Sequence, residues 1–279
     1  MKKTLPVDEL ARDDRFWRSR FEDNFNDPRI GAQAMKGTYT RAPERFSPEQ
    51  KNAPEASRSL MHGIFMGEIQ ALEGAGRTCW DFETGNAADQ APFDFKMAMA
   101  RQAWDEARHV EISVKLTEWM GTEIGEFSEN TFLYEAACNP DPVMRITGVN
   151  RALEGLAIDV FNTMKAFGEK CGDPIMEFCE DWMLADEVTH VKFGSDWLRK
   201  LTENDPDRRA RALEFQRVVD KLFSLGGLRS DKDESPVKLA RRFRELAGFT
   251  QEEIDDIADV AAEAADEARA RATGAAAAH

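Results

Sequence analysis

The hydrophobic and polar positions along this chain follow the spacing of helices rather than strands. No segment shows the sustained alternation of apolar and polar residues, with hairpin turns between, that is typical of a β-sheet. Several dipeptides instead place a capping residue before a proline at the first helical position, and glycines follow as stops. These dipeptides are Asp141-Pro142, Asp173-Pro174, Asp205-Pro206 and Ser235-Pro236. The sequence therefore predicts an all-α protein.

The longest helical patterns lie in the middle of the chain. Four long helices are predicted at about 56–82, 92–120, 142–171 and 174–202. Shorter helices are expected at about 206–225, 236–247 and 251–272. An irregular arm with one short aromatic helix precedes them all.

These helices suggest three parts. We expect an N-terminal arm with a short helix at 1–54, a four-helix bundle at 55–203, and a C-terminal helical extension at 204–279 that packs on the bundle. With 279 residues, the chain is long enough to bury a substantial core.

Charge and composition limit which classes of partner and which cellular location we expect. The net charge of −15 disfavours indiscriminate nucleic-acid binding, because phosphate contacts need local Lys and Arg. One arginine-rich stretch, 199–244, is explained more readily by a solvated helix face than by an RNA-binding patch. No apolar run approaches the roughly 18 residues of a membrane span, and no signal peptide is expected. The four cysteines lack Cys-x-x-Cys spacing, which indicates free thiols in a reducing cytoplasm.

Two copies of Asp-Glu-x-x-His carry the candidate chemistry. The chain has only 4 histidines, and two of them end the segments 105–109 and 186–190. On a helix, residues i and i+3 lie about 60° apart around the axis, so each Glu and His can hold one metal ion together. Ferritin-like bundles carry such a pair on two helices and a lone Glu on each of the other two. The pattern therefore predicts a site for two metal ions.

Counting residues from the turns places four glutamates at one level. Glu68 and Glu106 lie at similar distances on either side of the first turn. Glu154 and Glu187 flank the glycine turn between the third and fourth helices. The connection after the second helix can reach roughly 60 Å when extended, so the third helix can run parallel to the second. All four carboxylates and both histidines can then meet in the middle of the bundle.

The neighbours of these glutamates are apolar, so the carboxylates need compensation. Four unpaired carboxylates in a core would cost many kcal/mol, whereas two divalent cations cancel their charge. Carboxylate-rich sites with one imidazole per metal suit iron or manganese better than structural zinc. Asp105 and Asp186 are expected to accept the second imidazole N–H of the metal-bound histidines.

The metal segments also resemble a known family. The segment 67–71, Gly-Glu-Ile-Gln-Ala, resembles the first metal helix of rubrerythrins and related ferritin-like proteins. Together with 106–109, 151–159 and 186–194, it is similar to a bacterial ferritin-like family of largely uncharacterised function, related to the tRNA hydroxylase MiaE. The resemblance implies a two-metal site whose ligands are Glu68, Glu106, His109, Glu154, Glu187 and His190.

A function follows from that ligand set as a hypothesis. We expect an oxidase or oxygenase that uses two iron ions, or manganese and iron, to activate O₂. Its substrate would be a small or medium organic molecule, changed by hydroxylation, desaturation or N-oxygenation, with an electron donor as a further partner. Glu154 and either Glu106 or Glu187 are expected to bridge. The alternatives are an iron-binding ferroxidase without organic substrate, and a tRNA-modifying hydroxylase. A homodimer is expected only from the resemblance.

Other residues receive structural interpretations. Glu73 and His62 lie on other faces of the first long helix than Glu68, and Asp159 is turned away from Glu154 in the same manner. We interpret all three as supporting residues rather than ligands. Trp80, Trp104 and the methionines, Met97 among them, are expected in the core.

Overall fold

The computed structural model describes residues 55–127, 131, 134–135, 138–223 and 237–276, and these residues are overwhelmingly helical. They contain no β-strand, only an isolated bridge between Thr84 and Ala91. The all-α prediction is confirmed. The expected arm and its short helix lie outside the described residues. Within the described ranges, no helix is both long and apolar enough to cross a membrane, and all four cysteines are free thiols.

The helices follow the predicted order. Their bounds are α5 Glu55–Asp81, α6 Phe93–Trp119, α8 Pro142–Ile146, η3 Thr147–Leu153, α9 Glu154–Cys171, α10 Pro174–Leu201, α11 Pro206–Phe223, α12 Arg241–Leu246 and α13 Gln251–Ala276. The four long helices agree with the sequence to within a few residues, except that η3 interrupts the third with a π-helix. Helix α12 is shorter than expected, because it begins at Arg241 rather than near 236.

The predicted caps account for the starts of α8, α10 and α11, the last through Asp205, whose side chain accepts a hydrogen bond from the backbone N–H of Arg208. The side chain of Asp141 accepts hydrogen bonds from the backbone N–H groups at the start of α8, and Asp173 does the same for α10. Each supplies an acceptor to backbone donors that have no partner within the helix. Gly172 ends α9 with φ 67°, a left-handed conformation that glycine adopts without steric cost.

The chain divides into two compact units. The first takes the described residues of Met1–Met66 and Val110–Phe132, and the second takes those of Gly67–His109 and Leu133–His279. Helices α5 and α6 therefore contribute to both. All six candidate ligands belong to the second unit. The three-part division expected from the sequence stays a prediction.

His62 lies in the first unit and has a structural environment. Its Nε2 accepts a hydrogen bond of 3.0 Å from the backbone N–H of Gly125. The rings of Phe65 and Phe127 meet the imidazole edge-on, with centroid distances of 6.1 and 5.7 Å. This packing agrees with the interpretation of His62 as a core histidine.

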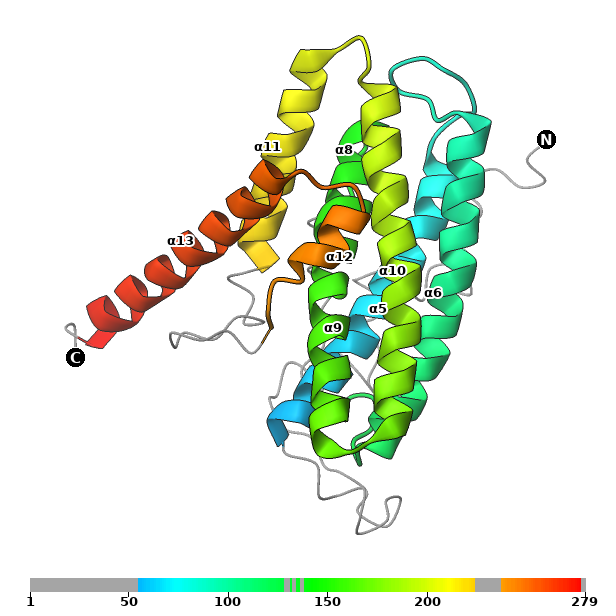
Figure 1. The fold of residues 1–279 in the computed structure, drawn as a ribbon. Coiled ribbons are helices and arrows are strands. Elements are labelled where there is room, and N and C mark those ends of the chain that lie inside the picture. The colour runs from blue at the N-terminus through cyan, green and yellow to red at the C-terminus, as the bar shows by residue number, and fades with distance from the viewer. Residues whose placement is uncertain (1–54, 128–130, 132–133, 136–137, 224–236, 277–279) are drawn as a thin grey trace. The chain divides into compact units, whose positions relative to one another are not determined.

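The second unit contains a ferritin-like four-helix bundle. Its helices are residues 67–81 of α5, residues 93–109 of α6, the continuous α8–η3–α9 segment, and α10 (Figure 1). Helices α6 and α9 run in one direction, and α5 and α10 run in the other (Figure 1). The long connection between the second and third helices thus permits the parallel arrangement that the sequence predicts.

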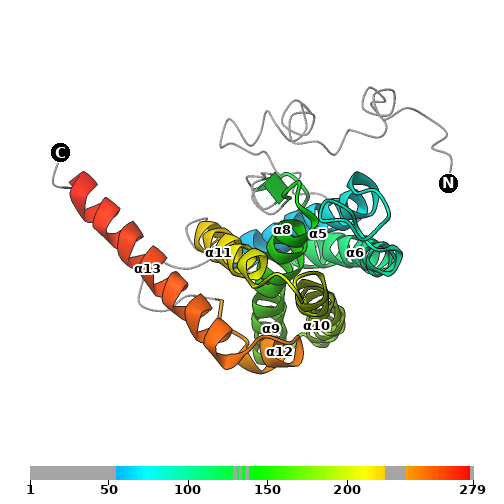
Figure 2. The same cartoon turned by 90° about the horizontal axis from the view of Figure 1, so that it is seen from above.

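The C-terminal helices pack on the bundle within the same unit. Helix α11 lies against α8 and η3, α13 lies against α11, and α12 lies against α9 and α10 (Figure 2). Two buried arginines tie them to the bundle: the guanidinium groups of Arg151 and Arg244 lie 4.0 and 5.4 Å from the ring centre of Phe249. Arg244 also pairs with Asp159 at 2.6 Å. Asp159 is therefore a structural partner of the C-terminal helices.

The prediction of a core position is wrong for three residues. Trp104 is 66% exposed, Met97 54% and Trp80 42%. On α6, Trp104 and Met97 lie about 180° around the helix axis from Glu106. The inner face of this helix carries the buried Phe95 and Met99 together with the polar ligands, so Trp104 and Met97 fall on its outer face.

Candidate metal centre

The six predicted ligands meet in two groups within the second unit. One group is Glu68, Glu106, His109 and Glu187, and the other is Glu106, Glu154, Glu187 and His190. In each group the four potential ligand atoms lie within 4.8 Å of one another, and every residue is buried. We call these groups the first and second metal positions. Glu106 and Glu187 belong to both, so these two, rather than Glu154, occupy the shared place between the positions.

Local helix geometry explains how each ligand arrives there. Glu106 and His109 lie one turn apart on α6, and Glu187 and His190 do so on α10, so each pair shares a face. Glu154 is the first residue of α9, directly after the π-helix η3. A π-helical turn shifts the residues that follow it around the axis, and such turns are frequent at functional sites.

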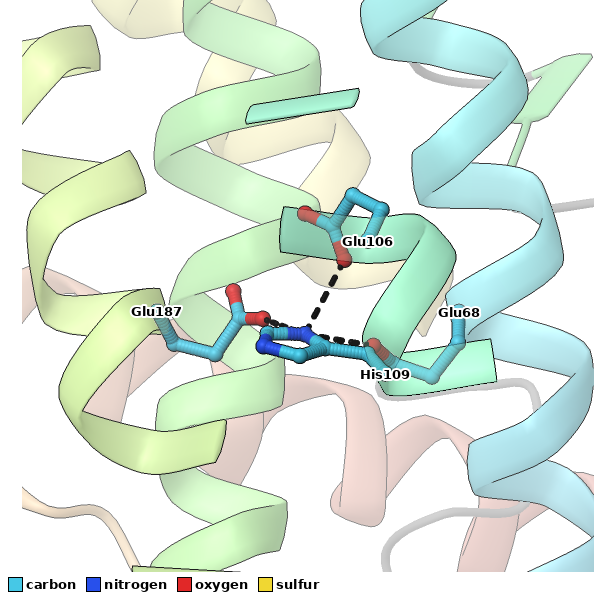
Figure 3. Close-up of side chains that lie close together, drawn as sticks. All are labelled: Glu68, Glu106, His109 and Glu187. Carbon is cyan, nitrogen blue, oxygen red and sulfur yellow. Dashed lines mark hydrogen bonds and ion pairs between the residues drawn. The ribbon is translucent and has the colours of Figure 1, made fainter. Parts of the chain in front are cut away.

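The first position centres on one nitrogen of His109 (Figure 3). Its Nδ1 lies 3.1 Å from Glu68 Oε2, 3.2 Å from Glu106 Oε2 and 3.0 Å from Glu187 Oε1. A single ring N–H cannot donate well to three carboxylates at once. Ligand atoms from four side chains around one point are instead what a cation requires.

The second position leaves several buried atoms without hydrogen bonds. His190 Nδ1 lies 3.0 Å from Glu106 Oε1 and 3.4 Å from Glu187 Oε2, but neither contact is aligned as a hydrogen bond. Both oxygens of Glu187 and one of Glu106 are likewise unsatisfied. Buried polar atoms of this kind are costly, so their accumulation at one place fits a pair of divalent cations.

Two aspartates hold the opposite edges of the imidazole rings. His109 Nε2 lies 3.3 Å from Asp186 Oδ2, and His190 Nε2 lies 3.3 Å from Asp105 Oδ2. Each aspartate therefore contacts the histidine of the other helix, and Arg108 contacts both carboxylates. With Nε2–H directed at a carboxylate, Nδ1 is left as the nitrogen that faces the cluster.

The pKa values of the clustered groups are shifted because several carboxylates are buried close together. Burial raises the pKa of Glu68 to about 8, and the charges of Glu106 and Glu187 add to this shift. Burial and the same two charges raise the pKa of Glu154 well above its usual value. Burial alone would lower the pKa of His109, but its contacts with Asp186 and the glutamates raise it. Divalent cations would relieve the repulsion, and this donor set suits iron or manganese.

Two buried amides near the second position were not found from the sequence. Gln102 Nε2 donates to Glu154 Oε1 at 2.6 Å and to Glu106 Oε1 at 3.2 Å. Asn150, in the π-helix, donates to Gln102 and, at 3.4 Å, to the backbone carbonyl of His190. Gln102 precedes Glu106 by one helical turn, and this spacing was an available signal. Nothing in the sequence pattern marks Asn150.

A buried carboxyl on α10 was also missed. Glu180 is fully buried, and neither of its oxygens has a hydrogen-bond partner. It lies two helical turns before Glu187, so the periodicity of α10 places it on the ligand face. Glu73, by contrast, is half-buried, and its charge acts on Tyr134 and Cys138. The structure does not bring Glu73 into either metal group.

Comparison with known proteins gives one family and several similar folds. The family model described as "Protein of unknown function (DUF455)" matches residues 2–255. Curated proteins give no significant match. Two similar solved structures are mutants of an R2-like ligand-binding oxidase with an aerobically reconstituted Mn/Fe cofactor. Both are 16% identical and cover 95% of this chain, with 98% and 97% of their own chains covered and TM-scores of 0.47 and 0.46. Similarity at this level carries no argument about activity.

Proposed function

The chain belongs to the family described as "Protein of unknown function (DUF455)", and we propose that it is an O₂-activating oxidase or oxygenase with a two-metal cofactor and an organic substrate. The observation that carries this proposal is the pair of buried four-residue groups that share Glu106 and Glu187. Two positions joined by common carboxylates are suited to metal ions that act together.

Different residues of the chain would bind each of the two metal ions. Glu68 and His109 would hold one ion, and Glu154 and His190 the other. Glu106 and Glu187 would bind both, and Asp105 and Asp186 would fix the imidazole rings. When bound, two iron ions, or one manganese and one iron ion, supply electrons for the reduction of O₂. In a hydroxylation, one oxygen atom enters a C–H bond and the other leaves as water, with two electrons and two protons from an external reductant.

Aromatic side chains border the first position. The rings of Phe161 and Trp182 lie edge-on to His109, with centroid distances of 6.2 and 6.1 Å. Because oxidising chemistry is quenched by water and by stray side chains, a dry wall favours oxidation of a bound substrate. Hydroxylation, desaturation and N-oxygenation are all compatible with this wall. An electron donor and a homodimeric state remain part of the proposal.

The tRNA-modifying alternative is less well supported, because arginines of the 199–244 stretch have acidic partners within the protein. Arg217 pairs with Asp256 and Glu263, and Arg241 pairs with Asp255 at 2.6 Å. Arginines neutralised in this way contribute little to phosphate binding. A ferroxidase without organic substrate would use the same ligands, so candidate substrates are to be screened once the O₂ reactivity tested below is established.

The first experiment measures iron content after anaerobic Fe(II) loading and then follows absorbance as O₂ is admitted. We expect about two iron ions per wild-type chain, one for each group. Glu154→Ala should retain about one ion, because Glu154 belongs to one group only, and should lose the change in absorbance. Glu73→Ala is the matched control and should behave as wild type. Absence of bound iron, or equal loading of wild type and Glu154→Ala, would rule out the two-metal centre.

A further inference from the structure

Glu180 is a buried acid that the metal ligands do not use. It lies on α10, seven residues before Glu187 and so on the same face, about 10 Å along the helix axis. Its exposed fraction is 0%. Glu180 is not among the groups that can hold a metal ion in the described part of the chain. Its burial therefore needs an explanation of its own.

The carboxyl group of Glu180 has no partner among the described residues. Both Oε1 and Oε2 are buried without a hydrogen bond. A helix side chain lies closest to residues three and four positions away, and here these are Met176, Met183 and Leu184, which are buried, and Glu177, which is partly exposed. A carboxyl group in apolar surroundings costs stability unless something else in the functional state satisfies it.

The position of Glu180 is on one side of the metal cluster. Burial raises its pKa well above the usual value, and the nearby charges that act on it are those of Glu68 and His109, both of the first metal position. At the second position, by comparison, the carboxylate of Glu154 accepts a hydrogen bond from Gln102, which in turn accepts one from Asn150. An open polar contact thus remains on the Glu68–His109 side, where Phe161 and Trp182 also border His109.

On the premise of the two-metal oxidase function, we propose that Glu180 is the polar contact of a substrate site on the Glu68–His109 side of the cluster. The ligand class is a largely apolar molecule that carries one hydrogen-bond donor, a hydroxyl or an amine. Its donor group would satisfy a Glu180 oxygen, and its apolar part would lie among the methionine, leucine and aromatic side chains. Contact with Glu180 would then orient the molecule with respect to the first metal position.

The physical reason for this selectivity is the cost of an unpaired buried acceptor. A site with a buried polar group discriminates strongly against a ligand that leaves the group unpaired. A hydroxyl or an amine can donate to an oxygen of the Glu180 carboxyl whether or not that group is protonated, whereas an ether can only accept from a protonated carboxyl and leaves its other oxygen unpaired. The structure therefore predicts discrimination between molecules of equal size and composition.

The test uses isomeric probes and protein loaded with Co(II). n-Hexanol and methyl pentyl ether have the same atoms, but only the alcohol has a donor, and n-hexylamine adds an amine. Dissociation constants are measured by calorimetry, and the visible Co(II) absorption reports whether a probe lies near the metals. We expect wild type to bind the alcohol and the amine about tenfold more tightly than the ether. Glu180→Leu should bind all three equally, and Glu177→Leu, one turn earlier on α10, should keep the preference.

Stability gives an independent readout. Leucine removes an unsatisfied carboxyl from an apolar place, so Glu180→Leu should melt about 3 °C or more above wild type. A lower melting temperature would assign Glu180 a structural role and overturn the proposal. So would probes that fail to bind wild type, equal binding of alcohol and ether, or a preference that survives in Glu180→Leu. Cobalt content is measured on each sample: failure to load counts against the two-metal function, whereas full loading without discrimination counts against the role of Glu180 alone.

Discussion

The first and second metal positions have the same kinds of ligand but different surroundings. At the second, Glu154 follows a π-helix and accepts a hydrogen bond from Gln102, which is itself held by Asn150. At the first, Glu68 lies within the regular helix α5, and the neighbouring acid Glu180 has no partner. The repeated Asp-Glu-x-x-His segments give equal ligands, so the difference comes entirely from residues outside the repeat. Glu154 at the second position therefore has a hydrogen-bond donor beside it, whereas the acid beside the first position has none.

Removing a ligand that both metal positions share should prevent metal binding at both positions. Glu187 belongs to both groups, so Glu187→Ala is expected to reduce metal content from about two ions per chain to nearly none. Glu154→Ala, which affects one group, provides the internal comparison. Metal content after gel filtration measures the effect. If Glu187→Ala retained one ion, the carboxylate would not be shared.

The crossed aspartates offer a way to weaken one position at a time. Asp186 contacts His109 and Asp105 contacts His190, so Asp186→Asn should weaken the first position and Asp105→Asn the second. Loss of such a partner typically costs about 10–100-fold in metal affinity. Titration with Co(II) resolves the two binding steps, and the visible spectra of half-loaded protein identify which position fills. Equal weakening of both steps in either variant would contradict the crossed arrangement.

Substitution of Gln102 should have the smallest effect on metal affinity and should distinguish the two positions most clearly. Gln102→Leu removes the donor to Glu154 and a longer contact to the shared Glu106, so binding at the second position should weaken by about tenfold and binding at the first position by less. Gln102→Glu is the companion variant, because it keeps the size but adds a negative charge beside Glu154. A change confined to the first step would show that Gln102 does not act through Glu154.

The sequence predicts which candidate ligands come together, because helical spacing and residue type suffice to place them. Glu106 and His109 need only a regular helix, and the levels of Glu68 and Glu154 follow from counting residues to the turns. The π-helix cannot be predicted in this way, since its wider turn depends on how Asn150 and Arg151 pack against α10 and α11. The same helical spacing could have placed Glu180 on the face of α10 that carries Glu187. It was missed because a single buried acid has no motif.

The outward position of Trp104 and Met97 has a related cause. Sequence patterns assign large apolar residues to the core, and most helices follow that rule. In α6 the inner face carries Gln102, Glu106 and His109 among buried apolar residues such as Phe95 and Met99. Trp104 and Met97 lie on the opposite face and are therefore exposed.

The buried arginines limit how far this protein can be shortened. Arg151 precedes Glu154 by less than one turn, and it reaches Glu253 of α13 and Gln216 of α11. Asp159, on the same segment, depends on Arg244 of α12. A chain that ended after α10 would leave the buried charges of Arg151 and Asp159 without these partners, in the helical segment that carries Glu154. A minimal bundle made for engineering would have to replace Arg151 and Asp159 by apolar residues before the C-terminal helices could be removed.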